Sequence, residues 1–224
     1  LMAGQPASWN DVDRDVAARL DAIRNAGGAV RLLTGTITSP MLLARIRAFL
    51  DTFTGARHVA YDALSASAML DAHQRTHGRR DLPRYRFDQA AVIVSIDADF
   101  LGTWIAPVEF TQGWREGRSL TGTPPRSSYH VQIEPRLSLT GIKADEWVPI
   151  RPGTYAALAL GMANVMINSQ LYDERFVRDF TFGFEDFQDA AGVTPQGFKR
   201  LVQEQYNLER VAAITGVPTE TIAR

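Results

Sequence analysis

The sequence predicts an α/β protein with a mostly parallel sheet flanked by helices. Strand-like and helical patterns alternate at least four times along the chain, which is the order that builds a parallel sheet with helical crossovers. Two apolar strand-like runs, 90–96 and 129–133, each lead directly into a polar loop. Because ligands of open parallel sheets bind outside the carboxyl ends of the strands, these two loops are the first candidates for a site.

The individual elements follow from apolar periodicity and from residues that start or stop helices. Ser8 precedes a helix whose apolar residues recur at three- and four-residue spacing until a glycine pair ends it. The sequence predicts strands over 29–34, 57–61, 90–96 and 129–133, and helices over 41–53, 65–77, 107–116, 155–167, 173–180, 196–205 and 208–215. We therefore expect a three-layer, Rossmann-like domain over 1–153 and a helical continuation over 154–224.

Composition limits the classes of function. The chain has 224 residues, of which 45% are hydrophobic and 22% charged, and its net charge of −1 offers no basic surplus for nucleic acid. It contains no cysteine, which excludes disulfides, thiolate-bound zinc, an iron–sulfur cluster held by cysteines of this chain and a cysteine nucleophile. No run approaches the ~18 apolar residues of a spanning helix, and residues 1–6 lack the regions of a signal peptide. Residues 219–224 read as a helix cut short, so we expect a part of a longer protein.

Two familiar motifs have simpler explanations than ligand binding. The glycines that flank the first strand match neither GxGxxG nor GxxxxGK[ST], and helix capping by Ser39 accounts for the turn after that strand. His73 and His77 lie four residues apart on a predicted helix, as a metal pair would. Gln74 stands where a metalloprotease motif requires glutamate, and no third ligand follows at an obvious spacing. A solvated helix end is the simpler interpretation.

Polar residues gather after the two central strands. Asp97 and Asp99 are separated by one residue, so they share an orientation if strand geometry continues. They could bind a cation, hold a ribose or amine, or cap the next turn. Segment 134–146 mixes both charge signs with small hydroxyl residues, as a polar ligand or an ordered ion-pair network would require. Loop 151–154 opens a long apolar helix, whose first N–H groups can bind phosphate.

Several segments, taken in order, resemble the molybdopterin oxidoreductase family. They are VSIDADFL at 94–101, QIEPRLSLT at 132–140, KADEWVPIRPGT at 143–154, LYDERFV at 171–177 and AITGVP at 213–218. The family is the dimethyl sulfoxide reductase superfamily, whose members bind bis-molybdopterin guanine dinucleotide with molybdenum or tungsten. The resemblance spans essentially the whole chain and implies a central α/β portion of a much larger catalytic-type subunit.

Within that superfamily, 97–101 and 107–110 look most like the molybdopterin-like subunits of membrane quinone oxidoreductase complexes. These include alternative complex III and the menaquinone reductase complex, and the polysulfide and thiosulfate reductases are similar. The resemblance implies a respiratory electron-transport role on the periplasmic face of the cytoplasmic membrane. The implied partners are an iron–sulfur subunit, a membrane quinone-binding subunit and the rest of the parent subunit.

The resemblance also implies particular site residues. In active relatives this portion cradles the guanosine and diphosphate ends of the cofactor. The implied cofactor contacts here are Asp97, Asp99, Glu134, Arg136, Thr140, Asp145, Arg151 and Gly153. The metal ligand of active relatives is a cysteine, selenocysteine or serine after the second strand, so Ser65 or Ser67 would have to serve in this chain.

Three departures from the family pattern point to weakened or lost cofactor binding. Tyr155 follows Arg-Pro-Gly-Thr, where an acidic residue usually binds the guanine, and a phenol cannot accept two N–H donors as a carboxylate does. Asp97 and Asp99 bring negative charge to a loop that would pass a diphosphate, which is repulsive without a cation. The usual metal-ligand position offers only serines.

We therefore expect a non-catalytic or cofactor-poor portion that serves as a scaffold and docking surface for an iron–sulfur subunit. The alternative is an active enzyme portion, with Ser65 or Ser67 on the metal, that reduces an oxyanion or sulfur substrate. A third possibility is a free-standing α/β protein that binds a small nucleotide. All of these interpretations require the loops at 97 and 134 to lie at the same edge of one sheet.

Overall fold

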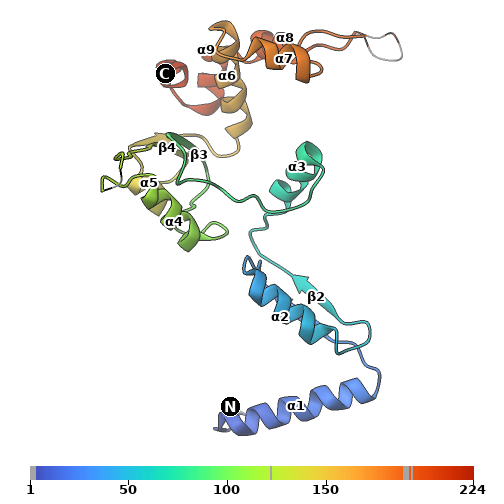
Figure 1. The fold of residues 1–224 in the computed structure, drawn as a ribbon. Helices are drawn as coiled ribbons and strands as arrows, with labels where there is room; N and C mark the ends of the chain where they lie inside the picture. The colour runs from blue at the N-terminus through green and yellow to red at the C-terminus, as the bar shows by residue number, and fades with distance from the viewer. Residues whose placement is uncertain (1–3, 122, 189–191, 193) are drawn as a thin grey trace. The chain divides into compact units, whose positions relative to one another are not determined.

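The structure is a computed structural model that describes residues 4–121, 123–188, 192 and 194–224. The chain divides into two compact units, an N-terminal unit over Leu1–Arg84 and a C-terminal unit over Tyr85–Arg224. Figure 1 shows both units and labels elements where there is room. Within the described residues the strands form two separate parallel sheets, one in each unit. The predicted α/β class, with parallel strands flanked by helices, is confirmed.

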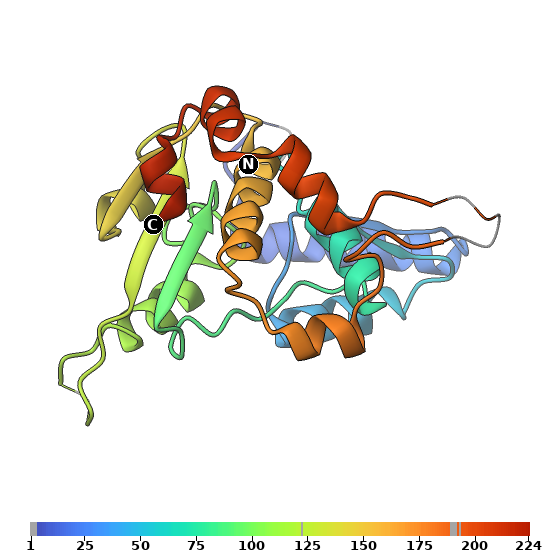
Figure 2. The ribbon, with the colours of Figure 1, turned by 90° about the horizontal axis from the view of Figure 1, so that it is seen from above.

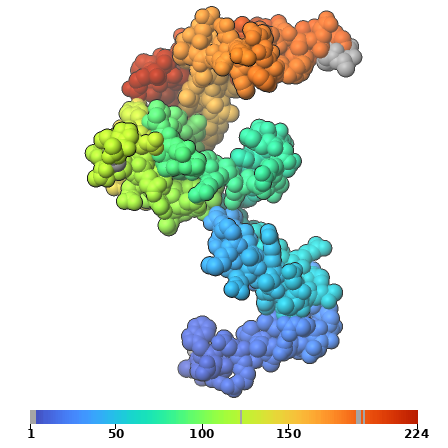
Figure 3. Space-filling model, in the orientation of Figure 1, coloured from blue at the N-terminus to red at the C-terminus, as the bar shows by residue number. Residues whose placement is uncertain are grey.

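The N-terminal unit is a small α/β arrangement. Its elements are α1 (Trp9–Asn25), β1 (Arg31–Thr34), α2 (Pro40–Leu50), β2 (Arg57–Ala60) and α3 (Ser67–His77). Strands β1 and β2 pair in parallel, and the predicted caps are confirmed because Ser8 and Ser39 each accept a backbone hydrogen bond at a helix start. The buried apolar residues are Ile46, Leu50 and Phe53. Helix α1 has no buried residue, and Figure 3 shows it, in dark blue, at the surface.

The C-terminal unit is built on three parallel strands in the order β3-β4-β5. They are β3 (Val92–Ile96), β4 (Tyr129–Glu134) and β5 (Glu146–Pro149), with α4 (Pro107–Glu116) and the short α5 (Leu139–Lys143) in the connections. Ile133 of β4 lies opposite Ile96 of β3 and Val148 of β5. Figure 2 shows β3 and β4, in green and yellow-green, side by side and pointing the same way. The loops at 97 and 134 therefore share one edge, as the interpretation required.

The helical tail is also confirmed. It consists of α6 (Tyr155–Asn168), α7 (Glu174–Phe180), α8 (Phe198–Gln205), α9 (Leu208–Thr215) and α10 (Thr219–Ala223). The main core joins Ile133, Val148 and Ile150 to Leu158, Val211, Val217 and Ile222. The domain boundary predicted at residue 153 stays a prediction, and this core contains residues on both sides of it. None of the described helices is long and apolar enough to cross a membrane.

A second cluster packs around β3 and α4. It buries Ile93, Phe100 and Phe110, and the Phe100 ring stacks on Phe87 with the centroids 4.5 Å apart. Aromatic rings bury large areas and prefer such offset or tilted contacts. The cluster supports the loop that follows β3, because Phe100 belongs to that loop.

A matched pair of glycine substitutions tests the close packing of α6 on α9. A Cβ at Gly161 would lie 2.7 Å from a methyl group of Val211, which is fully buried. A Cβ at Gly113 of α4 meets nothing closer than 3.6 Å. We expect Gly161→Ala to lower the free energy of unfolding by about 1 kcal/mol through overpacking, and Gly113→Ala to raise it by ~0.5–1 kcal/mol through helix propensity. Urea unfolding followed by tryptophan fluorescence measures both, and equal effects of the two substitutions would contradict the packing.

Candidate functional site

The carboxyl ends of β3, β4 and β5 bring together several of the predicted contact residues. Asp97 follows β3, Glu134 ends β4, and Arg151 and Gly153 follow β5. The backbone N–H of Asp97 donates to the carbonyl of Ile133 at 2.8 Å, which holds the first loop against β4. The edge predicted from the sequence therefore exists, and what it can bind depends on which polar groups are already paired.

Asp97 and Tyr155 are paired with each other across this edge. The Tyr155 hydroxyl donates to Oδ2 of Asp97 at 2.7 Å. Burial, reinforced by the Asp97 carboxylate, raises the pKa of Tyr155 to about 12, so the phenol stays protonated and remains a donor. Asp97 has a φ of 51°, a left-handed conformation that aspartate tolerates better than most residues. The bond ties the loop after β3 to the first residue of α6.

The Asp99 carboxylate also has hydrogen-bond partners within the chain. Its Oδ1 accepts from the hydroxyl and the backbone N–H of Thr140 at 2.7 and 3.1 Å, and its Oδ2 accepts from Thr103. Burial acts to raise the pKa of Asp99, but the Thr140 and Thr103 hydrogen bonds oppose it and lower the pKa below its usual value. Thr140 is fully buried and also accepts from the backbone N–H of Leu101. Asp99 and Thr140 therefore join the loop after β3 to α5.

Glu134 turns inward from the edge. It is 2% exposed, and its carboxylate accepts from the Ser138 N–H at 2.6 Å and from Nε2 of Gln132 at 2.9 Å. A Cβ at position 141 would lie 2.4 Å from Oε1 of Glu134, which explains the glycine there. The carboxylate holds the loop after β4 in place, and it does not face a ligand at the surface.

The remaining residues of this edge differ in whether they already have hydrogen-bond partners within the chain. The Arg151 guanidinium donates to the carbonyls of Ala213 and Ile214 in the last turn of α9, a favourable position for a cation. Gly153 has a φ of 77°, and a Cβ there would meet nothing within 4 Å. Arg136 is exposed, and it has no hydrogen bond or ion pair with the residues that the structure describes.

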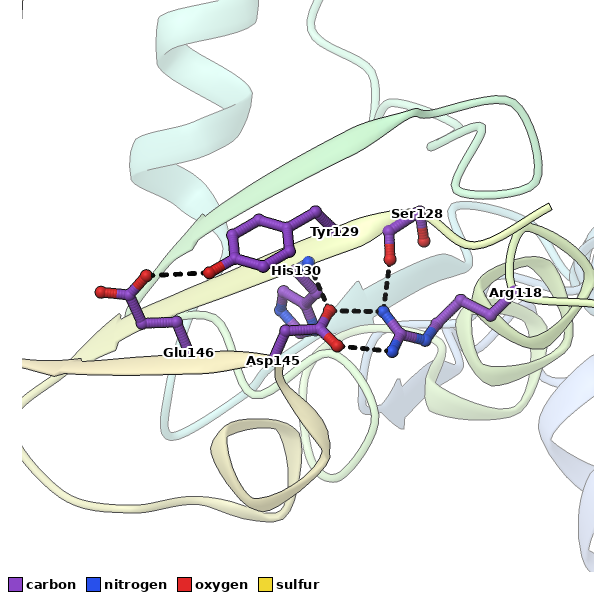
Figure 4. A network of polar contacts seen from close by, with 6 residues as sticks. All are labelled: Arg118, Ser128, Tyr129, His130, Asp145 and Glu146. Carbon is purple, nitrogen blue, oxygen red and sulfur yellow. Dashed lines mark hydrogen bonds and ion pairs between the residues drawn. The ribbon is translucent and has the colours of Figure 1, made fainter. Parts of the chain in front are cut away.

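Asp145 lies at the opposite edge of the sheet, just before β5. It forms two hydrogen bonds with the Arg118 guanidinium, at 2.6 and 2.8 Å, and accepts the His130 N–H at 2.8 Å. Arg118 also donates to the carbonyl of Ser128, and Figure 4 shows its guanidinium between Ser128 and Asp145. The hydrogen bonds from Arg118 lower the pKa of Asp145 to about 2. The structure therefore does not bring Asp145 to the other predicted contacts.

The predicted metal ligands lie in the N-terminal unit. Ser65 and Ser67 are exposed, and the Ser67 N–H donates to Oγ of Ser65 at 3.1 Å. Nearby, Asp62 accepts from the backbone and hydroxyl of Thr36, and the Thr36 hydroxyl is the main cause that lowers the pKa of Asp62. In the described ranges no three His, Cys, Asp or Glu side chains are grouped to hold a metal. The roles of the two serines stay predictions.

Two residues that organise these edges were not predicted from the sequence. Gln132 holds Glu134, and Arg118 holds Asp145. A signal for the first was present, because His130, Gln132 and Glu134 alternate with apolar residues in one strand. Side chains two apart in a strand share a face, so the alternation indicated a polar buried face. Arg118 lies in a Gly/Ser/Pro loop that gave no such signal.

Comparison with known proteins now gives the family. The family model described as molybdopterin oxidoreductase matches residues 4–216. The thiosulfate reductase molybdopterin-containing subunit PhsA of Salmonella typhimurium is 30% identical over 98% of this chain and 26% of its own length. Dimethyl sulfoxide reductase DmsA of Escherichia coli is 36% identical over 42% of this chain and 12% of its own.

A solved structure agrees with the sequence comparisons. The acetylene hydratase from Pelobacter acetylenicus matches 98% of this chain and 27% of its own chain, with a TM-score of 0.57 and 26% identity. This chain belongs to the molybdopterin oxidoreductase family, within the dimethyl sulfoxide reductase superfamily. It spans about a quarter of the length of PhsA and of the acetylene hydratase chain.

The low pKa of Asp145 predicts an acid-sensitive contribution to stability. Its folded pKa of about 2 lies below the usual 3.8, so the stabilisation is complete above pH 4 and is lost as the pH falls toward 2. Because this carboxylate is partly exposed and its ion pair is screened by solvent, we expect the wild-type chain to lose about 1 kcal/mol more than Asp145→Asn over this interval. Urea unfolding at pH 5, 4, 3 and 2 measures the difference, and parallel pH profiles would count against the Arg118 ion pair.

The Tyr155 hydroxyl is expected to stabilise the carboxyl edge. Tyr155→Phe removes one donor to a carboxylate and should lower the free energy of unfolding by about 1 kcal/mol. Tyr206→Phe is a suitable control, because that ring packs in the same core and its hydroxyl has no hydrogen bond with the described residues. If the two variants unfold at the same urea concentration, the Tyr155–Asp97 bond contributes nothing.

Proposed function

We propose that this chain is a portion of a molybdopterin-oxidoreductase-like subunit in which cofactor binding is weakened or lost. The hydrogen bond between Tyr155 and Asp97 carries the proposal. It occupies, with a phenol and a carboxylate of the same chain, the place where the family resemblance implies contact with the guanosine end of the cofactor. A guanine would have to compete with the Tyr155 hydroxyl for Oδ2 of Asp97, and a phenol cannot accept two N–H donors as a carboxylate does.

The other implied contacts support the same conclusion. Asp99, Glu134, Thr140 and Arg151 all have partners within the chain. The three carboxylates near the edge, Asp97, Asp99 and Glu134, each accept hydrogen bonds within the chain, and negative charge there would repel a diphosphate. The residues present therefore do not fit the guanosine diphosphate end of bis-molybdopterin guanine dinucleotide as a set of contacts, and we derive no chemical step through that group.

The setting that we propose is a membrane-associated respiratory complex. In it the subunit is a scaffold and docking surface for an iron–sulfur subunit, beside a quinone-binding membrane subunit, on the periplasmic face. The naming of PhsA as a molybdopterin-containing subunit of a thiosulfate reductase supports partner subunits in general. The proposed type of assembly is that of alternative complex III or the menaquinone reductase complex. In such an assembly the whole complex carries out electron transfer or quinone chemistry.

One observation favours the alternative of an active, cofactor-binding portion. Three strand ends share one edge, and both the exposed Arg136 and the open backbone at Gly153 remain able to meet a phosphate. In that alternative, bis-molybdopterin guanine dinucleotide supplies molybdenum or tungsten redox chemistry, and Ser65 or Ser67 is the metal ligand. Arg136 would be the main protein cation for the diphosphate.

Calorimetry of the 224-residue chain with guanosine diphosphate separates these proposals. We expect no heat of binding up to about 1 mM nucleotide. A dissociation constant above about 1 mM corresponds to a binding free energy weaker than ~4 kcal/mol. Binding at micromolar concentration would contradict lost cofactor binding. If it occurs, Arg136→Ala should abolish it for the active alternative. Stoichiometric molybdenum or tungsten with guanine dinucleotide in the intact subunit would equally remove the scaffold proposal.

A further inference from the structure

Two histidines on one face of α3 have no part in the function proposed above. His73 and His77 lie about one helical turn apart, and their rings are stacked at 23° with the centroids 5.1 Å apart. From the sequence alone, a solvated helix end is the simpler interpretation of this pair. The structure adds the arrangement of the two imidazoles and of the groups around them, and this arrangement suits a metal ion.

The spacing of the two rings fits chelation of one ion. Two histidines four residues apart are the pair with which the helix of a metalloprotease binds zinc. Zn–N bonds of ~2.0–2.1 Å at a tetrahedral angle place the centroids of two coordinating imidazoles roughly 5 Å apart. The observed separation matches this value, so rotation about side-chain bonds brings both rings to one ion. His73 is half-buried and His77 is exposed, and an ion in solution can therefore reach them.

The hydrogen bonds of Thr76 leave one nitrogen of His77 available as a ligand. The Thr76 hydroxyl donates its single proton to the carbonyl of Ala72 at 2.8 Å. The same hydroxyl lies 2.7 Å from Nδ1 of His77, so Nδ1 carries the ring proton and donates it to the hydroxyl oxygen. The lone pair of the neutral ring is then on Nε2. Metal-ligating histidines commonly have their other nitrogen held in this way.

The position of the pair at the end of α3 also suits a cation. His77 is the last residue of the helix, and the carbonyls of a last helical turn carry partial negative charge. Among the arginines near this end, Arg79 and Arg80 each form an ion pair with an aspartate, at 2.8 and 3.0 Å. Arg75 is exposed, and solvent and salt screen its charge.

Helix α3 has little support from the rest of the N-terminal unit. None of its residues is buried, and no side chain caps its N-terminus. Helices as short as this one are marginal in water without packing. An ion held by residues four apart joins two successive turns, so its binding favours the helical conformation over the others.

The other histidines of the chain do not form such a pair. The chain has four histidines and no cysteine. His130 is fully buried, and Nε2 of His58 lies 2.7 Å from the Thr34 hydroxyl. Chelation of an ion by two imidazoles of this chain can therefore be assigned to α3.

We propose that His73 and His77 bind one divalent ion of the nickel, copper or zinc type and thereby stabilise α3. Imidazole suits these ions, whereas calcium and magnesium prefer oxygen ligands. The chain supplies two ligands, in agreement with the absence of a group of three in the part of the chain that the structure describes. The remaining coordination positions are open to ligands from outside the chain. The inference holds whether or not a cofactor binds at the carboxyl edge.

Calorimetric titration of the 224-residue chain with Ni²⁺, Cu²⁺ and Zn²⁺ at neutral pH tests the site. We expect one ion per chain, with the tightest binding for Cu²⁺ and no heat with Mg²⁺ or Ca²⁺. His73→Ala and His77→Ala should each lower the affinity at least about tenfold, because chelation by two linked groups is lost. Unchanged affinity in either variant would overturn the proposal.

A shifted pair of histidines is the matched control. The double variant Arg75→His with His77→Ala keeps two imidazoles on α3 but places them two residues apart, where side chains do not face each other. We expect this variant to bind as weakly as His77→Ala alone. Binding as tight as that of the wild-type chain would mean that any exposed imidazoles suffice, and the proposed geometry would be wrong.

Hydrogen exchange measures the effect of the ion on the helix itself. With free Zn²⁺ at about 100 times its dissociation constant, local opening of α3 should become up to about 100-fold rarer. We therefore expect slower amide exchange in residues 67–77 and unchanged exchange in β3, which is the internal comparison. If Zn²⁺ binds but the exchange of α3 does not slow, or if β3 slows to the same extent, the ion is not held by this pair.

Discussion

The C-terminal unit depends on one constraint, which is that the central strand of its sheet carries polar side chains on a buried face. His130, Gln132 and Glu134 all point into the side covered by α4 and α5, where an apolar residue would need no partner. Burying an unpaired polar group costs about as much as several good hydrogen bonds contribute. The loops after β3 and β4 supply partners for two of these side chains, the Ala98 carbonyl for Gln132 and the Ser138 N–H for Glu134, so the geometry at the carboxyl ends of the strands follows from this requirement.

The requirement explains why carboxylates near the candidate site have hydrogen-bond partners within the chain. Glu134 is held by a backbone N–H of the next loop and by Gln132, and Asp99 by Thr140 and Thr103. Asp99 joins two segments that are distant in sequence, and Glu134 holds the turn that follows its own strand. Both are structural roles. The family shape of the edge can thus be retained by interactions within the chain, without any contribution from a bound cofactor.

Much of the fold was predictable from the sequence, and the site was predictable only in part. The strands at 90–96 and 129–133 were indicated by apolar runs bounded by polar loops, and the parallel pairing followed from the helix between them. The strand β5 was missed because its four residues, Glu146–Pro149, show no apolar run. The position of Asp145 could not be predicted, since only the register of β5 against β4 places it at the amino edge. The pairing of Tyr155 with Asp97 joins residues 58 positions apart, which no local pattern reveals.

The affinity of a ligand for this edge is limited by what it must displace. A guanine that takes the place of the Tyr155 hydroxyl replaces a hydrogen bond within the chain by one with the ligand, so only the difference contributes to binding. The intramolecular partner is already held in place, whereas the ligand must also lose translational and rotational freedom. A ligand could still gain from groups with no competitor, and Arg136 is such a group among the described residues. One surface arginine provides little binding energy by itself, which is why the internal pairing of Asp97 weighs more heavily than the shared edge in deciding between a scaffold and a cofactor-binding portion.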